Sequence, residues 1–167
     1  MGAADDEGEA TEPEENTDDT APLIDTITAT PLQVHLHSPS EHTIDSESFD
    51  VEVHFVNTFV EQMPGPDAEN EGRDKLAVVG VMFDVAKGGN KKNLLLESWI
   101  NLYEKSDWET YMDLSEFAPD TTQFYHYKGS LTTPPCSEIV EWFVLKEVQS
   151  ISEEQLEKIQ KYTHSWT

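Results

Sequence analysis

A nearly continuous apolar run at residues 76–85, LAVVGVMFDV, constrains the fold of this chain more than any other segment. A run of this length cannot span a bilayer, and it is typical of a strand that is buried on both faces of a sheet. Residues 32–37 and 49–57 alternate apolar and polar side chains, which indicates strands with one buried face. Residues 138–145, EIVEWFVL, are a further strand candidate. We therefore expect a sheet with 76–85 as its central strand.

Helical patterns are fewer and lie outside these segments. Residues 152–162 form the clearest one, because Ser152 and Gln155 have the spacing of a capping box before an amphipathic stretch. The pattern at 94–105 is ambiguous, and we favour a helix. The composition of two segments, rich in Gly and Pro or acids, predicts loops at 61–74 and 86–93. The fold class expected is mostly β (α+β), a strand-dominated domain with peripheral helices.

The charge balance is strongly acidic, with 34 Asp and Glu against 10 Lys and Arg and a formal net charge of −24. This balance argues against nucleic acid and anionic membranes as partners, since both need clustered basic side chains. It indicates a solvated acidic surface or, alternatively, an acidic patch that binds a partner. Residues 1–21 hold nine acids and almost no apolar side chain, so we predict a disordered segment there and one domain over 22–167.

The ends of the chain and its cysteine content give weaker signals. The first residues, MGAADDEGEA, lack the basic start and apolar run of a signal peptide. The single cysteine, Cys136, has no partner for an internal disulfide.

Three histidines carry the chemical signal. His35 and His37 are two residues apart in a strand pattern, so both point to one face of the sheet, and His54 lies on the next expected strand. If the two strands pair antiparallel, the three imidazoles converge. Three histidines with an open fourth position form a catalytic zinc arrangement. Alternating histidines are also common on ordinary polar faces, but Gln33 and Glu52 stand where the partners of zinc-bound histidines are needed.

Three blocks make a family resemblance specific. LQVHLHSPSEHTID, FDVEVHFVN and YKGSLTTPPCSEIVEWFVLKE are similar, in this order, to the core of the alpha-class carbonic anhydrases. The likeness runs from about Pro31 to about Leu156. It implies a large twisted mixed sheet with Zn²⁺ at the bottom of a conical cavity. It also implies a zinc lyase that hydrates carbon dioxide reversibly to bicarbonate and a proton by means of a zinc-bound hydroxide.

The resemblance also implies roles for single residues. His35, His37 and His54 match the zinc ligands, and Gln33 and Glu52 match the residues that hold them. Thr132 matches the hydroxyl that accepts a hydrogen bond from the zinc hydroxide, and Glu41 matches the carboxylate that accepts the Thr132 proton. His42 matches a structural histidine. The residues that match the substrate pocket are Val56, Val78, Leu131, Thr133, Val140 and Trp142.

Some features of the family are not matched. The family's N-terminal part, with its proton-shuttling histidine, and its C-terminal strands have no counterpart here, so we expect a domain that is truncated at both ends. Neither His126 nor His164 matches a shuttle position, and both are expected to be surface or structural residues. A catalytically silent, carbonic-anhydrase-related interaction module, a piece of a multi-chain enzyme with a complementing chain or subunit, and a fragment without the fold remain alternatives. The cysteine of the TTPPC block favours a secreted origin.

Overall fold

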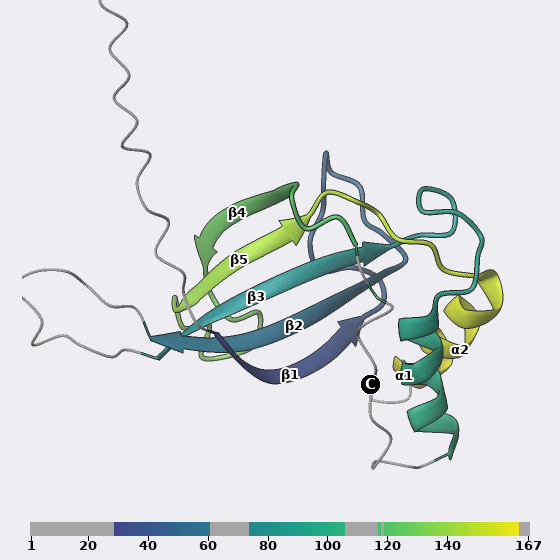
Figure 1. Ribbon diagram of the computed structural model, residues 1–167, viewed down its shortest axis with the longest axis horizontal. Helices are drawn as coiled ribbons and strands as arrows, with labels where there is room; N and C mark the ends of the chain where they lie inside the picture. The colour runs from purple at the N-terminus through teal and green to yellow at the C-terminus, as the bar shows by residue number, and fades with distance from the viewer. Residues whose placement is uncertain (1–28, 61–73, 106–116, 118, 164–167) are drawn as a thin grey trace, which may run out of the picture.

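The computed structural model describes residues 29–60, 74–105, 117 and 119–163. Within this part of the chain, three strands are followed by a helix, two further strands and a second helix (Figure 1). In chain order they are β1 (Thr30–His37), β2 (Val51–Val60), β3 (Asp74–Phe83), α1 (Leu94–Lys105), β4 (Phe124–Gly129), β5 (Val140–Leu145) and α2 (Glu153–Thr163).

The strands form one mixed, twisted sheet in the order β1-β2-β3-β5-β4. Neighbouring strands run antiparallel, except that β3 and β5 are parallel. The apolar run that begins at Leu76 therefore lies in the middle of the sheet, with β2 on one side and β5 on the other, as its composition predicts. Among the described strands, β1 and β4 lie at the two edges.

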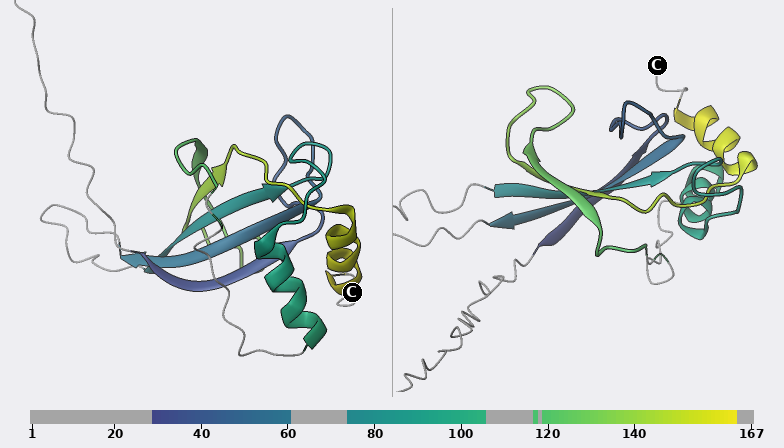
Figure 2. Two further views of the ribbon diagram at one scale, coloured as in Figure 1. Left: turned by 45° about the vertical axis from the view of Figure 1, so that its right-hand side comes forward. Right: turned by 90° about the horizontal axis from the view of Figure 1, so that it is seen from above.

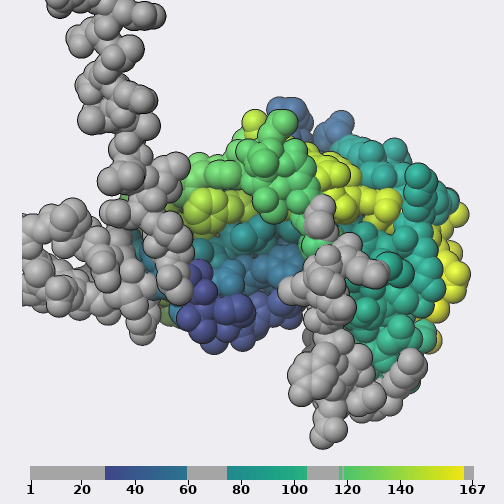
Figure 3. Space-filling view, in the orientation of Figure 1, coloured from purple at the N-terminus to yellow at the C-terminus, as the bar shows by residue number. Residues whose placement is uncertain are grey.

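Both helices pack near one end of the sheet (Figures 1 and 2), against the face that carries Val51, Val53 and Val81. The space-filling view shows the helical residues gathered at that end, with the strands side by side next to them (Figure 3). The core between sheet and helices consists of fully buried apolar side chains. They are Val51, Val53, Val81, Phe83, Leu95, Leu96, Ile100, Leu145, Ile151 and Ile159.

The predicted capping box starts α2. The Gln155 backbone N–H donates to Ser152 Oγ at 3.2 Å, and the Ser152 N–H donates to Gln155 Oε1 at 3.4 Å. The buried Gln155 amide also accepts from the backbone N–H of Asn93 at 2.9 Å and donates to its carbonyl at 2.8 Å. One side chain thus ties the beginnings of both helices together, which fixes the helical layer.

The observed elements differ from the expected ones at a few boundaries. β3 ends at Phe83 instead of 85, because the Asp84 carboxylate accepts hydrogen bonds from the N–H groups of Ala86 and Lys87 and closes a turn. The strand β4 was not expected, since its sequence FYHYKG has no clear alternation. The segments 1–21 and 61–73 lie outside the described residues, so the predictions made for them stay predictions.

No helix within the described ranges is long and apolar enough to cross a membrane.

Candidate metal centre

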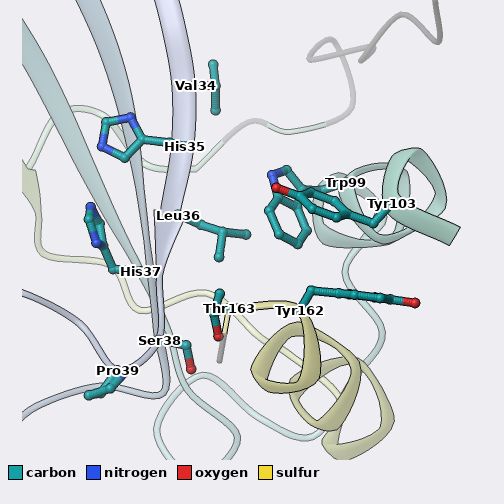
Figure 4. A pocket seen from close by; sticks show the side chains of 10 residues that line it. All are labelled: Val34, His35, Leu36, His37, Ser38, Pro39, Trp99, Tyr103, Tyr162 and Thr163. Carbon is teal, nitrogen blue, oxygen red and sulfur yellow. The ribbon is translucent and has the colours of Figure 1, made fainter. Parts of the chain in front are cut away.

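Strand alternation places the predicted ligands on the face of the sheet away from the helices. Figure 4 shows His35 and His37 on one side of β1, while Val34 and Leu36 point to the other side, toward Trp99 of α1. There Val34 and Leu36 line a cavity of about 560 Å³ beside the helices. The two faces of β1 therefore serve different purposes, one for packing and one for the histidines.

The pairing of β1 with β2 brings the third histidine to the same place. The strands are antiparallel, and His35 lies directly opposite His54. The Nδ1 atom of His54 is 3.3 Å from Nε2 of His35, and one ring nitrogen of each of the three histidines lies within 4.8 Å of the others. The ring centroids are 4.8–5.1 Å apart. The convergence expected from the strand pattern is therefore present.

A buried carboxylate orients His54. Glu52 is fully buried, and its Oε1 lies 2.8 Å from Nε2 of His54 and 2.5 Å from Nδ1 of His42. Its Oε2 accepts the backbone N–H groups of Glu41 at 3.0 Å and His42 at 2.9 Å. An ionised carboxylate only accepts hydrogen bonds, so Nε2 of His54 donates to it. In a neutral ring, Nδ1 of His54 then carries no proton, and it faces His35.

The protonation states suit metal binding. Burial alone would raise the pKa of Glu52, but the hydrogen bonds from His42 and His54 outweigh it and hold that pKa well below its usual range. Burial, followed by the nearby rings of His54 and His37, lowers the pKa of His35 from 6.5 to about 4. Burial also lowers the pKa of His37. The His35 and His37 imidazoles are therefore neutral at pH 7, which metal ligation requires.

The donor set fits a zinc ion. The Nε2 atom of His37 is buried and has no hydrogen-bond partner, so it is available to a metal, although the Glu41 carboxylate lies 3.4 Å away. Three imidazoles on two strands match the three-histidine sites of catalytic zinc. A second group of potential ligands, His42, Glu52 and His54, also lies within 4.8 Å. Its members are already hydrogen-bonded to one another, so it is the weaker candidate.

A cavity of about 280 Å³ opens over the three histidines. Apolar side chains from β2, β3 and β5 form much of its wall, and the loop after β4 adds two hydroxyl groups. Every residue that the sequence predicted for the substrate pocket lines it, together with Leu76, which was not predicted. The lining residues are Gln33, His35, His37, His54, Val56, Leu76, Val78, Leu131, Thr132, Thr133, Val140 and Trp142.

Two predicted contacts are not made in this structure. Glu41 and Thr132 are not hydrogen-bonded to each other, and the Glu41 carboxylate lies instead near His37. Gln33 is exposed at the cavity wall, and Nδ1 of His35, its expected partner, is buried without a hydrogen bond. The roles predicted for Glu41, Thr132 and Gln33 stay predictions.

The sequence reasoning missed one residue of this network. The hydroxyl of Tyr127 lies 2.6 Å from Nε2 of His42, so a chain of contacts runs from Tyr127 through His42 and Glu52 to His54. Burial and then the Glu52 charge raise the pKa of Tyr127. A strand prediction over 124–129 would have found this tyrosine, because β4 pairs with β5 and sets Tyr127 opposite Trp142. Of the two histidines without a predicted role, His126 is exposed and contacts Glu141, and His164 lies outside the described residues.

Comparisons with known proteins agree with this geometry. The sequence model of the eukaryotic-type carbonic anhydrases matches residues 11–167. Alpha carbonic anhydrase 3 of Arabidopsis thaliana is 34% identical over 129 residues, which cover 75% of this chain and 42% of that protein. A carbonic anhydrase of Klebsiella pneumoniae is 33% identical over 146 residues, which cover 83% of this chain and 53% of that protein.

Solved structures give the same result. The alpha-carbonic anhydrase of Thermovibrio ammonificans, in complex with the inhibitor sulfanilamide, superposes with a TM-score of 0.61 at 34% identity, covering 78% of this chain and 53% of that one. The alpha-carbonic anhydrase of Photobacterium profundum superposes with a TM-score of 0.62 at 32% identity, covering 82% and 58%.

The mixed sheet carries a three-histidine cluster on the face away from the helices, an arrangement that suits a zinc-dependent enzyme domain. The chain belongs to the alpha, or eukaryotic-type, carbonic anhydrase family. It spans about half the length of the curated relatives described above.

Proposed function

We propose that this chain binds one Zn²⁺ ion through His35, His37 and His54 and hydrates carbon dioxide reversibly to bicarbonate and a proton. The observation that carries the proposal is the orientation of His54. The carboxylate of Glu52 holds the proton on Nε2, so Nδ1 is left as a lone-pair donor facing His35. Zinc-bound histidines commonly donate their other ring N–H to a carboxylate, which fixes the nitrogen that binds the metal. When bound, zinc supplies Lewis acidity that lowers the pKa of a coordinated water from 15.7 to about 7.

The cavity wall supports carbon dioxide as the substrate. Val78, Val140 and Trp142 are nearly inaccessible to solvent and form a continuous apolar surface beside the histidines. A nonpolar gas molecule loses no hydrogen bonds on entering such a site, whereas a charged product is disfavoured there. The hydroxyl of Thr132 lies on the same wall, and we propose that it positions the attacking oxygen by a hydrogen bond.

The two carboxyl groups near the cluster have separate tasks in this proposal. Glu52 orients His54 from behind and does not contact substrate. Glu41, near His37 here, is proposed to accept the Thr132 proton and so to leave a Thr132 lone pair for the attacking oxygen. The proton produced in each turnover leaves through solvent or an added buffer, because no shuttle residue was identified in the sequence.

Zinc content and carbon dioxide hydration measured on the same purified chain test the proposal. We expect about one zinc per chain and hydration above the buffer rate. The variant His54→Ala should lose both, because it removes the ligand that Glu52 orients. The matched control is His126→Ala, which removes an exposed histidine that also contacts a glutamate, Glu141. Full zinc binding by His54→Ala refutes the metal site.

A second measurement separates the enzyme from a silent module. Zinc binding at one ion per chain without any hydration would support the interaction module and reject the catalytic proposal. Sulfanilamide, which the Thermovibrio ammonificans relative binds, is proposed to inhibit this chain in a zinc-dependent manner. A secreted location stays a prediction from the family resemblance.

A further inference from the structure

Gly80 lies in the middle of β3, directly beside the metal centre. It pairs with His54 across the β2–β3 ladder and with Val144 across the β3–β5 ladder. A Cβ atom added at Gly80 would lie 2.9 Å from Glu52 Oε1, 3.9 Å from Glu52 Cδ and 3.6 Å from a Val144 methyl group. The first distance is shorter than van der Waals contact, which lies near 3.5 Å. Any side chain at this position therefore collides with the carboxylate that orients His54.

The backbone gives no other reason for a glycine here. Gly80 does not have a positive φ angle, so an L-residue can adopt its conformation. A glycine inside a strand weakens it relative to alanine and often marks a close approach of another group. Of the described glycines, Gly80 is the one whose added Cβ would meet Glu52. The missing side chain is thus explained by the space that Glu52 needs.

The carboxylate cannot move aside without loss. Glutamate ends are usually flexible, but Glu52 is fully buried and both oxygens are engaged. Oε1 contacts His42 and His54, and Oε2 accepts two backbone N–H groups of the 41–42 turn. A displacement of Oε1 away from Gly80 must lengthen at least one of these four contacts. Hydrogen bonds to a buried charge are costly to leave unmade.

We propose that Gly80 is a positioning residue of the metal centre, whose lack of a side chain holds the Glu52 carboxylate against His54 and so keeps Nδ1 of His54 as the metal-binding nitrogen. This inference rests on the proposed zinc site. It adds that the inner strand β3, which contributes no ligand, controls the affinity of the ligands on β1 and β2. Gly80 acts through Glu52 and touches neither metal nor substrate.

The variant Gly80→Ala tests the proposal with two readouts. In metal-free protein, nitrogen NMR of the His54 ring reports which nitrogen carries the proton, and we expect the Nε2–H signal to shift or disappear. In the zinc titration we expect binding to weaken ten- to a hundredfold, the usual effect of losing a partner of a zinc-bound histidine. The control Val79→Ile adds one methyl group on the opposite face of the same strand and should bind zinc like the parent chain.

A double-mutant cycle assigns the effect to the collision. In a Glu52→Ala background the carboxylate is gone, so Gly80→Ala should cause no further loss of zinc affinity or urea stability. If Gly80→Ala alone does not fold, the proposal predicts that Glu52→Ala with Gly80→Ala folds as well as Glu52→Ala. Equal losses in both backgrounds, or an unchanged His54 signal and zinc affinity in Gly80→Ala, overturn the proposal.

The NMR readout also keeps this inference separate from the proposed function. If the parent chain binds no zinc, the zinc proposal fails, while the His54 proton position in metal-free protein still supports or rejects the role of Gly80.

Discussion

Replacing Glu52 by glutamine is the sharpest test of how this centre is built, because it keeps size and shape and reverses a hydrogen bond. A glutamine has one acceptor oxygen and one NH₂ donor. The two backbone N–H groups of the 41–42 turn can only donate, so they fix the amide oxygen at the place of Oε2. The NH₂ group then faces Nε2 of His54 and Nδ1 of His42.

The rings of His42 and His54 must then each accept a hydrogen bond from this NH₂ group. His42 can place its proton on Nε2 and donate to the hydroxyl of Tyr127, which lies 2.6 Å away. His54 has to place its proton on Nδ1, the nitrogen that faces His35. Zinc binding must then first break the new hydrogen bond or move the proton. The lost bond to a charged acceptor is worth about 1.5–3 kcal/mol, and 1.4 kcal/mol corresponds to a factor of ten. We therefore expect Glu52→Gln to weaken zinc binding about ten- to a hundredfold.

A competition titration against a coloured chelator measures the affinity, and nitrogen NMR of metal-free protein measures the His54 proton position. Urea unfolding checks that the fold is kept. The matched control is Glu141→Gln, since Glu141 also contacts a histidine, His126, but away from the metal centre. An Nε2-protonated His54 in Glu52→Gln, or parental zinc affinity, would refute the reasoning.

Three further outcomes are expected. Thr132→Ala should lower the hydration rate by about 10²–10³ while zinc affinity stays close to parental, because one positioning hydrogen bond is lost and no ligand; an equal loss in zinc titrations argues against this role. Val78→Phe should fill part of the 280 Å³ cavity and slow hydration by about 10²-fold without loss of bound zinc, as counted by metal analysis; undiminished turnover would contradict the apolar wall as substrate site. Removing zinc with a chelator should lower the melting temperature, because zinc at a thousandfold its dissociation constant adds about 4.1 kcal/mol to the free energy of unfolding. A calorimetric scan without this shift would mean that metal binding and folding are not coupled.

Much of the fold followed from local patterns. The apolar run at 76–85 identified the central strand because side chains are buried on both faces of β3, Val81 and Phe83 on one face and Val78 and Met82 on the other. The capping box identified the start of α2 because Ser152 and Gln155 satisfy each other's N–H groups. Strand β4 was not predicted because its side chains are mostly exposed and show no buried face. Its strand conformation depends on pairing with β5, which is a long-range contact.

The candidate site was predictable to a similar degree. The two-residue period of a strand predicted that His35 and His37 lie on one face of the sheet. The antiparallel pairing of β1 with β2 predicted that His54 lies beside them. The family resemblance, not the spacing, singled out the residues that line the cavity. The position of Glu41 near His37, and the collision of a Gly80 side chain with Glu52, depend on distances between strands and loops that no sequence period encodes.

Among the described strands β1 is an edge strand, bonded to the sheet through β2 alone, and it carries two of the three candidate ligands. Edge strands exchange their amide hydrogens by local fraying, well before the sheet as a whole unfolds. A metal ion held by His35 and His37 on β1 and by His54 on β2 would clamp the fraying strand to its neighbour. The amide protons of β1 should therefore exchange more slowly in zinc-loaded protein, and the ion should leave when β1 peels away rather than when the whole domain opens.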